Sequence, residues 1–449
     1  MFKKILIANR GEIAVRIIRA CREMNIATVA VYSEADRDAL HTQLADEAVC
    51  IGPATSKDSY LNIYNILSAT VLSGAEAIHP GFGFLSENSK FAKMCRECNI
   101  TFIGPDPEAI DLMGNKANAR DVMKKAGIPV IPGSDGALES EEHALKMAEE
   151  IGYPVMIKAA AGGGGRGIRI VFEKGELQKA YNTAKSEAAA CFADDTLYME
   201  KYINKPHHIE FQILGDQFGN IIHLGERDCS IQRRNQKVVE EAPSLLLDDK
   251  MRKVMGEAAV KAARTVGYYN AGTIEFLVDS DRNYYFMEMN TRVQVEHPIT
   301  EFISGVDIVK QQLRIAAGER LDLCQDDIVL RGHAIECRIN AEDPSKDFRP
   351  SPGKISGLHL PGGPGVRIDS AVYQGYIIPP YYDSMIAKLI VHADSRDEAI
   401  ARMRRALGEM IVEGLETNVE FQFDILSNES FKAGDYDTSF LKDKLVKNE

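Results

Sequence analysis

The sequence predicts a protein that combines α/β and α+β parts, and two patterns carry this prediction. In roughly the first 105 residues, short apolar segments alternate with segments of helical periodicity, which favours a doubly wound parallel sheet. From about residue 133 to 290, glycine loops separate segments that alternate apolar and polar residues, which favours antiparallel strands with intervening helices. A third, α+β region begins near residue 331. The 449 residues suffice for about two to four domains.

The first part contains five predicted strands joined by helices. The strands are expected at residues 5–8, 28–32, 48–51, 77–79 and 101–103. Apolar residues at helical spacing predict a helix over 13–24, and further helices are expected over 62–72 and 87–97. Because strands that alternate with helices are joined by right-handed crossovers, these strands should run parallel.

The later parts show fewer but clear helical patterns. A helix is expected over 306–316, after the antiparallel region. Clusters of glycine and proline at 360–365 and 379–380 indicate loops in the third part. The helix that follows has one apolar face, formed by Ile400, Met403, Leu407 and Met410.

Composition narrows the possible functions. The chain has 53 basic and 66 acidic residues and a formal charge of −13, which argues against general binding to nucleic acid. The longest segment without a formal charge is 17 residues, from Ser59 to Ala75, so no membrane span is expected. The N-terminus has too few apolar residues before Asn9 for a secretory signal. Six of the eight cysteines are scattered, while Cys95 and Cys98 form an isolated C-x-x-C, interpreted as two small residues on a helix with a redox or zinc site as the alternative. Together these features predict a cytoplasmic protein.

A glycine-rich loop is the first candidate site. Residues 162–167 match G-x-G-x-x-G, which alone is a weak signal. A dinucleotide-binding turn needs a helix after the loop, whereas strands are expected on both sides, at 154–158 and 167–172. A glycine loop between strands is typical of a flap over nucleotide phosphates, and Lys158 is placed to bind a phosphate. The alternative is a mobile surface hairpin.

A predicted hairpin supplies the second candidate site. Two strands flank a turn centred between Asp281 and Arg282, and this register places Glu275 opposite Glu288. Asn290, two residues further, faces the same side. Opposed carboxylates destabilise a sheet unless a cation lies between them, and three hard oxygen ligands favour Mg²⁺ or Mn²⁺. The alternative is a pair of solvated surface carboxylates.

Two charged segments accompany these sites. Residues 226–237 contain four cations: Arg227, Arg233, Arg234 and Lys237. They could hold a small anion or form a solvated face. The segment after Asn290 adds Arg292, Glu296 and His297. On residue type alone, His207 and His208 are interpreted as surface or hydrogen-bonded side chains.

In combination, these segments resemble the biotin carboxylase component of biotin-dependent carboxylases, an ATP-grasp enzyme, and most of all the acetyl-CoA carboxylase component. The matching segments are 7–14, 79–88, the 162–167 loop, 233–237, 288–298 and Arg338 within 336–340. The resemblance covers essentially all 449 residues. It implies an N-terminal α/β domain over 1–114, an ATP-grasp domain over 115–330 with a mobile lid at about 131–202, and a C-terminal domain over 331–449.

The resemblance also implies a reaction, in which ATP phosphorylates bicarbonate to carboxyphosphate and the carboxyl group passes to N1′ of biotin. The implied ATP contacts are Lys116, Lys158, Gly164, Gly165, His208, Gln232, Asn235, Glu275 and Glu288, with an adenine hinge at Glu200, Lys201 and Ile203. Two Mg²⁺ or Mn²⁺ ions would be held by Glu275, Glu288 and Asn290. Bicarbonate would contact Lys237, Arg292, Val295, Glu296 and Arg338, and biotin would contact Arg338 and Phe82. The implied catalytic residues are Lys237, Arg292, Glu296 and Arg338.

The chain departs from the family pattern at two of these positions. Asn235 stands where many members have His, and a neutral amide cannot supply the charge or the proton of an imidazole. Phe82 stands where Tyr is common, which removes one hydroxyl from the implied biotin pocket.

Partners are also implied by the resemblance. The attachment motif Ala-Met-Lys-Met is absent, so biotin is expected on a separate carrier protein, and separate carboxyltransferase subunits are expected to select the final acceptor. The family commonly forms homodimers, for which Arg16, Arg19 and Glu23 are candidate contacts on the exposed side of the first helix.

Two alternatives compete with this function. A carbamoyl-phosphate-synthesising module should contain two ATP-grasp bodies, and this chain contains one. A regulatory nucleotide-binding protein should lack Lys237, Arg292 or Glu296, and all three are present.

Overall fold

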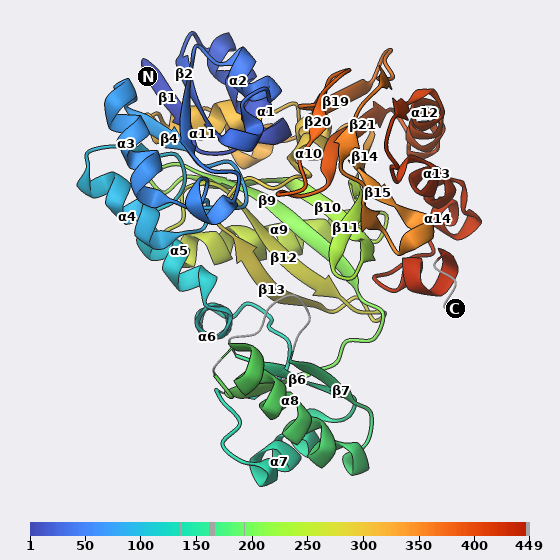
Figure 1. Ribbon diagram of the computed structural model, residues 1–449. Helices are drawn as coiled ribbons and strands as arrows, with labels where there is room; N and C mark the ends of the chain where they lie inside the picture. Colours follow the sequence, from blue (N-terminus) through green and yellow to red (C-terminus); the bar gives the residue numbers. More distant parts are fainter. Residues whose placement is uncertain (135, 161–166, 193, 446–449) are drawn as a thin grey trace.

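The computed structural model describes residues 1–449 except 135, 161–166, 193 and 446–449. It contains a parallel sheet at the N-terminus, a large antiparallel sheet in the centre and a small three-stranded unit at one end of the molecule (Figure 1). Among the residues described, no helix combines the length and the apolar character that a membrane span requires.

The N-terminal sheet has the strand order β3-β2-β1-β4-β5, and all its strands are parallel. Its strands are β1 (Lys4–Ile7), β2 (Ala27–Ser33), β3 (Glu47–Gly52), β4 (Ala77–His79) and β5 (Thr101–Phe102). The helices are α1 (Gly11–Glu23), α2 (Leu40–Leu44), α3 (Ile63–Ser73), α4 (Ser89–Glu97) and α5 (Pro107–Gly114). The five predicted strands and their parallel direction are confirmed. The order reverses between β1 and β4, where open α/β sheets commonly bind ligands.

One expectation for α1 is wrong. Arg16 was predicted on the exposed side of this helix, but only 9% of the residue is exposed. Its guanidinium lies 3.0 Å from Glu301 and 2.6 Å from Asp307. The helix contacts both α11 (Ile308–Ala316) and β19 (Val366–Ser370), so nearly all its faces are covered. Arg19 and Glu23 are exposed, as expected.

The central sheet has eight antiparallel strands in the order β13-β12-β9-β10-β11-β14-β21-β19. The strands not yet given are β9 (His207–Gly215), β10 (Ile221–Arg233), β11 (Gln236–Ala242), β12 (Asn270–Val278), β13 (Tyr284–Asn290), β14 (His333–Asn340) and β21 (Met385–Ala393). β14, β21 and β19 come from the predicted third part. The sheet is therefore continuous across the boundary expected near residue 330.

Helices cover both faces of the central sheet. α9 (Asp249–Thr265) packs on one face over a core that includes Ile209, Phe211, Ile274 and Phe276. The other helices are α10 (His297–Ser304), α11, α12 (Arg396–Glu409), α13 (Val419–Ser427) and α14 (Glu429–Ala433). The helix predicted over 306–316 is confirmed as α11. The predicted apolar face of the C-terminal helix is also confirmed, since Ile400, Met403, Leu407 and Met410 are all buried.

The small unit contains the sheet β7-β6-β8 and two long helices (Figure 1). Its elements are α7 (Glu141–Ile151), β6 (Val155–Ala159), β7 (Ile168–Val171), α8 (Leu177–Phe192) and β8 (Leu197–Lys201), and α6 (Lys116–Lys125) precedes them. It has a hydrophobic core of its own. The prediction of strands on both sides of the glycine loop is confirmed. Gly164 and Gly165 lie outside the described residues.

Candidate functional site

One cavity of about 2070 Å³ brings the predicted site residues together. It lies between the small unit, the N-terminal part and the charged face of the central sheet. Every predicted site residue that the structure describes lines it: Phe82, Lys116, Lys158, Glu200, Lys201, Ile203, His208, Gln232, Asn235, Lys237, Glu275, Glu288, Asn290, Arg292, Val295, Glu296 and Arg338.

The carboxylates of the predicted hairpin face each other because the hairpin contains a β-bulge. Near the turn Phe276 pairs with Phe286, so a regular hairpin would continue with Glu275 opposite Met287. The register shifts here, and Glu275 pairs with Glu288. The predicted pairing is confirmed, but the uniform register that led to it is wrong. Without the extra residue, Glu288 would lie on the other face of the sheet.

Glu275 belongs to a row of charged side chains across four strands. Glu288 on β13, Glu275 on β12, Glu210 on β9 and Arg227 on β10 are successive neighbours. Arg227 is fully buried and donates to Glu210 at 2.5 Å. Its remaining N–H groups donate to Gln212, Thr273, Gln294 and Thr300. Arg227 therefore supports the floor of the cavity, and it forms neither a solvated face nor an open anion site.

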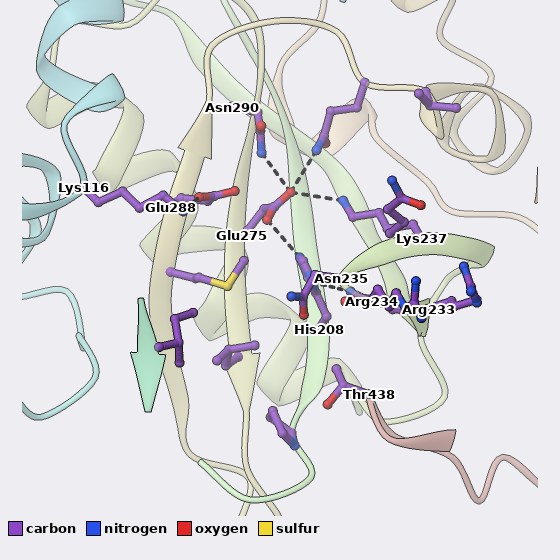
Figure 2. A pocket seen from close by; sticks show the side chains of 18 of the residues that line it. Lys116, His208, Arg233, Arg234, Asn235, Lys237, Glu275, Glu288, Asn290 and Thr438 are labelled. Carbon is purple, nitrogen blue, oxygen red and sulfur yellow. Dashed lines mark hydrogen bonds and ion pairs between the residues drawn. The ribbon is translucent and has the colours of Figure 1, made fainter. Parts of the chain in front are cut away.

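Lys237, at the start of β11, bridges three carboxylates. Its Nζ lies 3.1 Å from Glu275 (Figure 2). It also lies 2.5 Å from Glu210 and 2.6 Å from Glu296. One ammonium group thus faces three buried carboxyl groups. This excess of hard oxygen ligands suits a divalent cation.

Burial and nearby cations act in opposite directions on two of these carboxyls. Burial disfavours the charged form of Glu275, but Lys237 and His208 outweigh it and hold the pKa of Glu275 well below its usual range. Burial also opposes ionisation of Glu296, whereas Lys237 and Arg338 hold the pKa of Glu296 well below its usual range. Both groups are therefore carboxylates at neutral pH.

Arg338, on β14, connects Glu296 to a further buried acid. It donates through Nη2 to Glu296 at 2.9 Å and through Nε to Glu240 at 2.6 Å. Burial, opposed by Arg338 and reinforced by Glu296, raises the pKa of Glu240 to about 7. Arg338 thus lies between an ionised carboxylate and an acid that is partly protonated at neutral pH.

Arg292 reaches the cavity from the segment after β13. It donates to Asn290 Oδ1 at 3.0 Å and to Glu87 Oε2 at 2.8 Å. Glu87 also accepts from the backbone N–H of Thr291 at 3.1 Å. A carboxylate of the N-terminal part therefore orients a cation of the central part.

His208 is buried at the centre of the cavity wall, not on the surface. Its Nε2 lies 3.0 Å from Glu275, and its Nδ1 lies 2.7 Å from Gln232 Nε2. Burial lowers the pKa of His208, but Glu275 outweighs burial and raises it overall. The alternative of a hydrogen-bonded side chain is thus the correct one for His208.

The small unit and the segments beside it provide the other end of the cavity. Lys158 on β6 pairs with Glu200 on β8. Lys116, at the start of α6, lies 2.8 Å from Glu288, and 62% of its side chain is exposed. The side chain of Lys201 donates to two backbone carbonyls of the small unit, at 2.8 and 2.9 Å. Ile203 follows in the connection to β9.

Asn235 occupies a position that suits asparagine for a local reason. Arg234 and Asn235 form the two-residue turn between β10 and β11, and their φ angles are 50° and 63°. Such turns need left-handed residues, and Asn adopts that conformation readily. Arg233 and Arg234 both pair with Asp347, at 2.5 and 2.8 Å, so another part of the chain already holds these two cations.

Phe82 lies at the N-terminal end of the cavity. Its backbone carbonyl accepts from Asn9 Nδ2 at 2.7 Å, and the same amide donates to Pro80 at 2.6 Å. Asn9 follows β1 and Phe82 follows β4, so this end of the cavity is the switch point of the parallel sheet.

The predicted metal ligands are neighbours but do not form a closed set. Asn290 Nδ2 donates to Glu275 at 2.8 Å, while Glu288 pairs with Lys116. Among the described residues, two groups have ligand atoms close enough to share an ion: His208 with Glu210 and Glu275, and Glu210 with Cys229 and Glu296. The oxygen donors of Glu275, Glu288 and Asn290 fit Mg²⁺, and Lys116 pairs with one of the two oxygens of Glu288.

Several residues of this site were not predicted from the sequence. Glu210 contacts Lys237 directly, Glu240 holds Arg338, and Glu87 holds Arg292. A signal existed for Glu210, because alternate residues of a predicted strand, 208, 210 and 212, are polar. Glu87 and Glu240 had no comparable local signal.

Family profiles match three consecutive parts of the chain. Residues 1–110 match the N-terminal domain of biotin carboxylase, and residues 336–443 match its C-terminal domain. Between them, residues 115–324 match the ATP-binding domain of the carbamoyl-phosphate synthase L chain.

Individual proteins are similar over nearly the whole length. A biotin carboxylase of Nostoc is 62% identical over 442 residues, which cover 98% of this chain and 99% of the relative. One of the pyruvate carboxylase subunits of Methanothermobacter thermautotrophicus is 56% identical over 98% of this chain and 90% of the relative. The biotin carboxylase domain dimer of Hydrogenobacter thermophilus 2-oxoglutarate carboxylase, solved with MgADP, ADP and bicarbonate, is 56% identical over 98% of this chain and 97% of that one, with a TM-score of 0.93.

Proposed function

The chain belongs to the biotin carboxylase family, and we propose that its cavity carries out the ATP-dependent carboxylation of carrier-bound biotin with bicarbonate. Biotin carboxylase is an ATP-dependent ligase that uses magnesium. The observation that carries the proposal is the buried cluster in which Lys237 and Arg338 both contact Glu296. Two fixed cations beside one carboxylate suit the binding and deprotonation of a small anion such as bicarbonate.

The nucleotide belongs at the end lined by the small unit. Lys116 and Lys158 neutralise phosphate charge, Gly164 and Gly165 contact phosphates, and Glu200, Lys201 and Ile203 form the adenine hinge. His208, Gln232 and Asn235 complete the nucleotide contacts. Lys116 and Lys158 now pair with single carboxylates, which a phosphate can replace.

Glu275, Glu288 and Asn290 would hold a divalent cation, which would supply positive charge to neutralise the phosphates. Lys237 and His208 lower the pKa of Glu275, so this ligand is ionised at neutral pH. Asn290 is positioned through its bonds to Glu275 and Arg292. We propose two Mg²⁺ or Mn²⁺ ions, the number that the family resemblance implies.

Bicarbonate is bound between Lys237, Arg292, Arg338 and the Val295 backbone. Once the anion occupies Lys237 and Arg338, these cations stabilise the Glu296 charge less, and the pKa of Glu296 rises toward its usual range. Glu296 then accepts the proton of bicarbonate as a general base, which makes the oxygen a better nucleophile toward the γ-phosphoryl group.

The second step transfers the carboxyl group to biotin. Carboxyphosphate decomposes to CO2 and phosphate, and the phosphate removes the N1′ proton of biotin. Arg338 stabilises the negative charge that develops on the ureido oxygen. Phe82 lines the biotin end of the cavity through its ring, without the hydroxyl that Tyr would provide.

The test is ADP formation measured with and without bicarbonate and free biotin. We expect ADP formation that depends on bicarbonate and is stimulated by biotin. Rapid ATP turnover indifferent to both compounds would contradict the proposed function. For the role of Arg338, the variant Arg338→Ala should lose biotin carboxylation; retained biotin carboxylation with reduced bicarbonate-dependent ATP cleavage would contradict it.

We further propose a biotin carboxyl carrier protein and carboxyltransferase subunits as partners, a homodimer as the assembly and the cytoplasm as the location. All eight cysteines are unpaired, which fits a reducing compartment. Relatives are named for pyruvate and 2-oxoglutarate carboxylases as well as plain biotin carboxylases, so the final acceptor is a property of the partner. Acetyl-CoA is our proposed acceptor, and co-purification of carboxyltransferase subunits would test it.

A further inference from the structure

A buried lysine lies behind the proposed bicarbonate site. Lys388, on β21, is 0% exposed. In the strand register it lies opposite Arg338 on β14 and Asp369 on β19, so the three charged residues form one row across neighbouring strands. Arg338 reaches the cavity, but Lys388 does not line it.

The ammonium group of Lys388 contacts the backbone of the site. Its Nζ donates to the carbonyl oxygen of Val295 at 2.8 Å. It also lies 3.2 Å from Glu12 on α1 and 3.7 Å from Asp369. The neutral carbonyl is therefore the nearest of its three partners. Burying an ammonium group costs a large desolvation free energy. This cost suggests that Lys388 has a role other than pairing with charges.

The Val295 carbonyl belongs to the turn that presents the proposed base. Val295 and Glu296 lie between β13 and α10, and Glu296 is the residue before the first turn of α10. No side-chain cap bond holds Glu296 at this helix end. The ammonium group of Lys388 holds the peptide between Val295 and Glu296 by its carbonyl, whereas the Glu296 carboxylate is held by Lys237 and Arg338.

Resting on the proposed function, we propose that Lys388 is a positioning residue for the bicarbonate site, acting through the Val295–Glu296 turn. Because Lys388 reaches α1, β19 and this turn at once, it ties the turn to the N-terminal and C-terminal parts. The proposed bicarbonate contacts include Val295 and Glu296, whereas the proposed ATP contacts lie elsewhere in the cavity. A change in the turn should therefore weaken bicarbonate binding more than ATP binding.

Two double variants distinguish a hydrogen bond to the Val295 carbonyl from mere neutralisation of Glu12 by Lys388. In E12Q/K388M the buried charges stay balanced, but no donor reaches Val295. In E12Q/K388Q the charges are equally balanced, and an amide N–H replaces the ammonium. The single variant E12Q is the control for Glu12.

We expect E12Q/K388M to raise the KM for bicarbonate about tenfold or more and to lower kcat, with the KM for ATP within about twofold of wild type. E12Q/K388Q should recover part of the bicarbonate KM, because it restores a donor. Equal bicarbonate KM values in the two double variants, or equal rises for ATP and bicarbonate, would overturn the proposal. So would failure of both double variants to fold while E12Q folds, because Lys388 would then be structural. Absence of bicarbonate-dependent ADP formation in the wild type would instead overturn the proposed function.

Discussion

The two ends of the cavity hold their cations in opposite ways. At the central-sheet end, 12% of the Lys237 side chain and 18% of the Arg338 side chain are exposed, and each contacts at least two carboxylates. At the end formed by the small unit, 62% of the Lys116 side chain is exposed, and it contacts Glu288. Lys158 is intermediate, with 24% of its side chain exposed and Glu200 as its partner.

This difference indicates how each end meets its ligand. Buried charges need several fixed partners, because each one left alone carries a large desolvation penalty. The central-sheet end is therefore organised before a small anion arrives. An exposed cation with one partner can exchange that partner at little cost. The other end can thus release its carboxylates and bind phosphates instead.

The largest expected effect follows from removing Lys237, which contacts three carboxylates at the central-sheet end. Lys237→Met leaves Glu210, Glu275 and Glu296 buried without their common cation. The free energy of unfolding should fall by about 3–5 kcal/mol, measured by urea denaturation at neutral pH. A loss below about 1 kcal/mol would show that the two ends do not differ as described.

The second prediction concerns the proposed base at the organised end. Glu296→Gln keeps the size of the side chain but cannot accept a proton from bicarbonate. Bicarbonate-dependent ADP formation should fall about 10²- to 10³-fold, while the KM for ATP should change little. A decrease of less than about tenfold would remove Glu296 from this role.

The third prediction concerns Glu241, a buried carboxylate that does not line the cavity but is likewise held by neighbouring polar groups. Glu241 contacts His333 at 2.6 Å and Arg396 at 2.7 Å. Burial opposes its ionisation, but the hydrogen bond with His333 and the guanidinium of Arg396 lower the pKa of Glu241 to about 2. Because the folded-state pKa is depressed, the stabilisation is present above the ordinary pKa of about 4.5 and is lost as pH falls toward 2.

The expected contribution of Glu241 is on the order of 3 kcal/mol at neutral pH. It can be measured as the difference in unfolding free energy between wild type and Glu241→Gln at several pH values. This difference should shrink steadily between about pH 5 and pH 3. A difference that stays constant over this range would contradict the depressed pKa.

The smallest expected effect on stability is at the exposed end. Lys116→Met should change the free energy of unfolding by less than about 1 kcal/mol, since the pair with Glu288 is largely solvated. The KM for ATP should rise about tenfold because the proposed phosphate contact is lost. The KM for bicarbonate should stay unchanged; a parallel rise would mean that the two ends are coupled.

Local patterns were enough to predict much of the fold. The five parallel strands, the helix α11 and the strands around the glycine loop follow from apolar periodicity over short segments. The pairing of Glu275 with Glu288 was predicted, although the bulge that produces it was not. A bulge adds one residue without a distinctive sequence signal, so its position depends on how the strand packs against its neighbours.

Errors arose where burial depends on distant elements. Arg16 lies on a helix whose sequence alone suggests an exposed polar face, but α11 and β19 cover it. Arg227 lies in a basic segment that resembles a solvated face, but it is fully buried beside Glu210. In both cases the partners lie on other helices or strands, so the pattern within the segment itself could not reveal them.

The sequence by itself determined which chemical groups are present and which local elements carry them. Glycine spacing, strand alternation and the motif around Glu296 supported the family resemblance. The resemblance in turn supplied most of the predicted site residues, and all of those that the structure describes line the cavity. Only the tertiary structure decided which carboxylate faces which cation. Glu210, Glu240 and Glu87 contact Lys237, Arg338 and Arg292 through strand pairing and packing between distant parts. The physical reason is that charge interactions depend on distance and burial in space, and neither is set by separation along the chain.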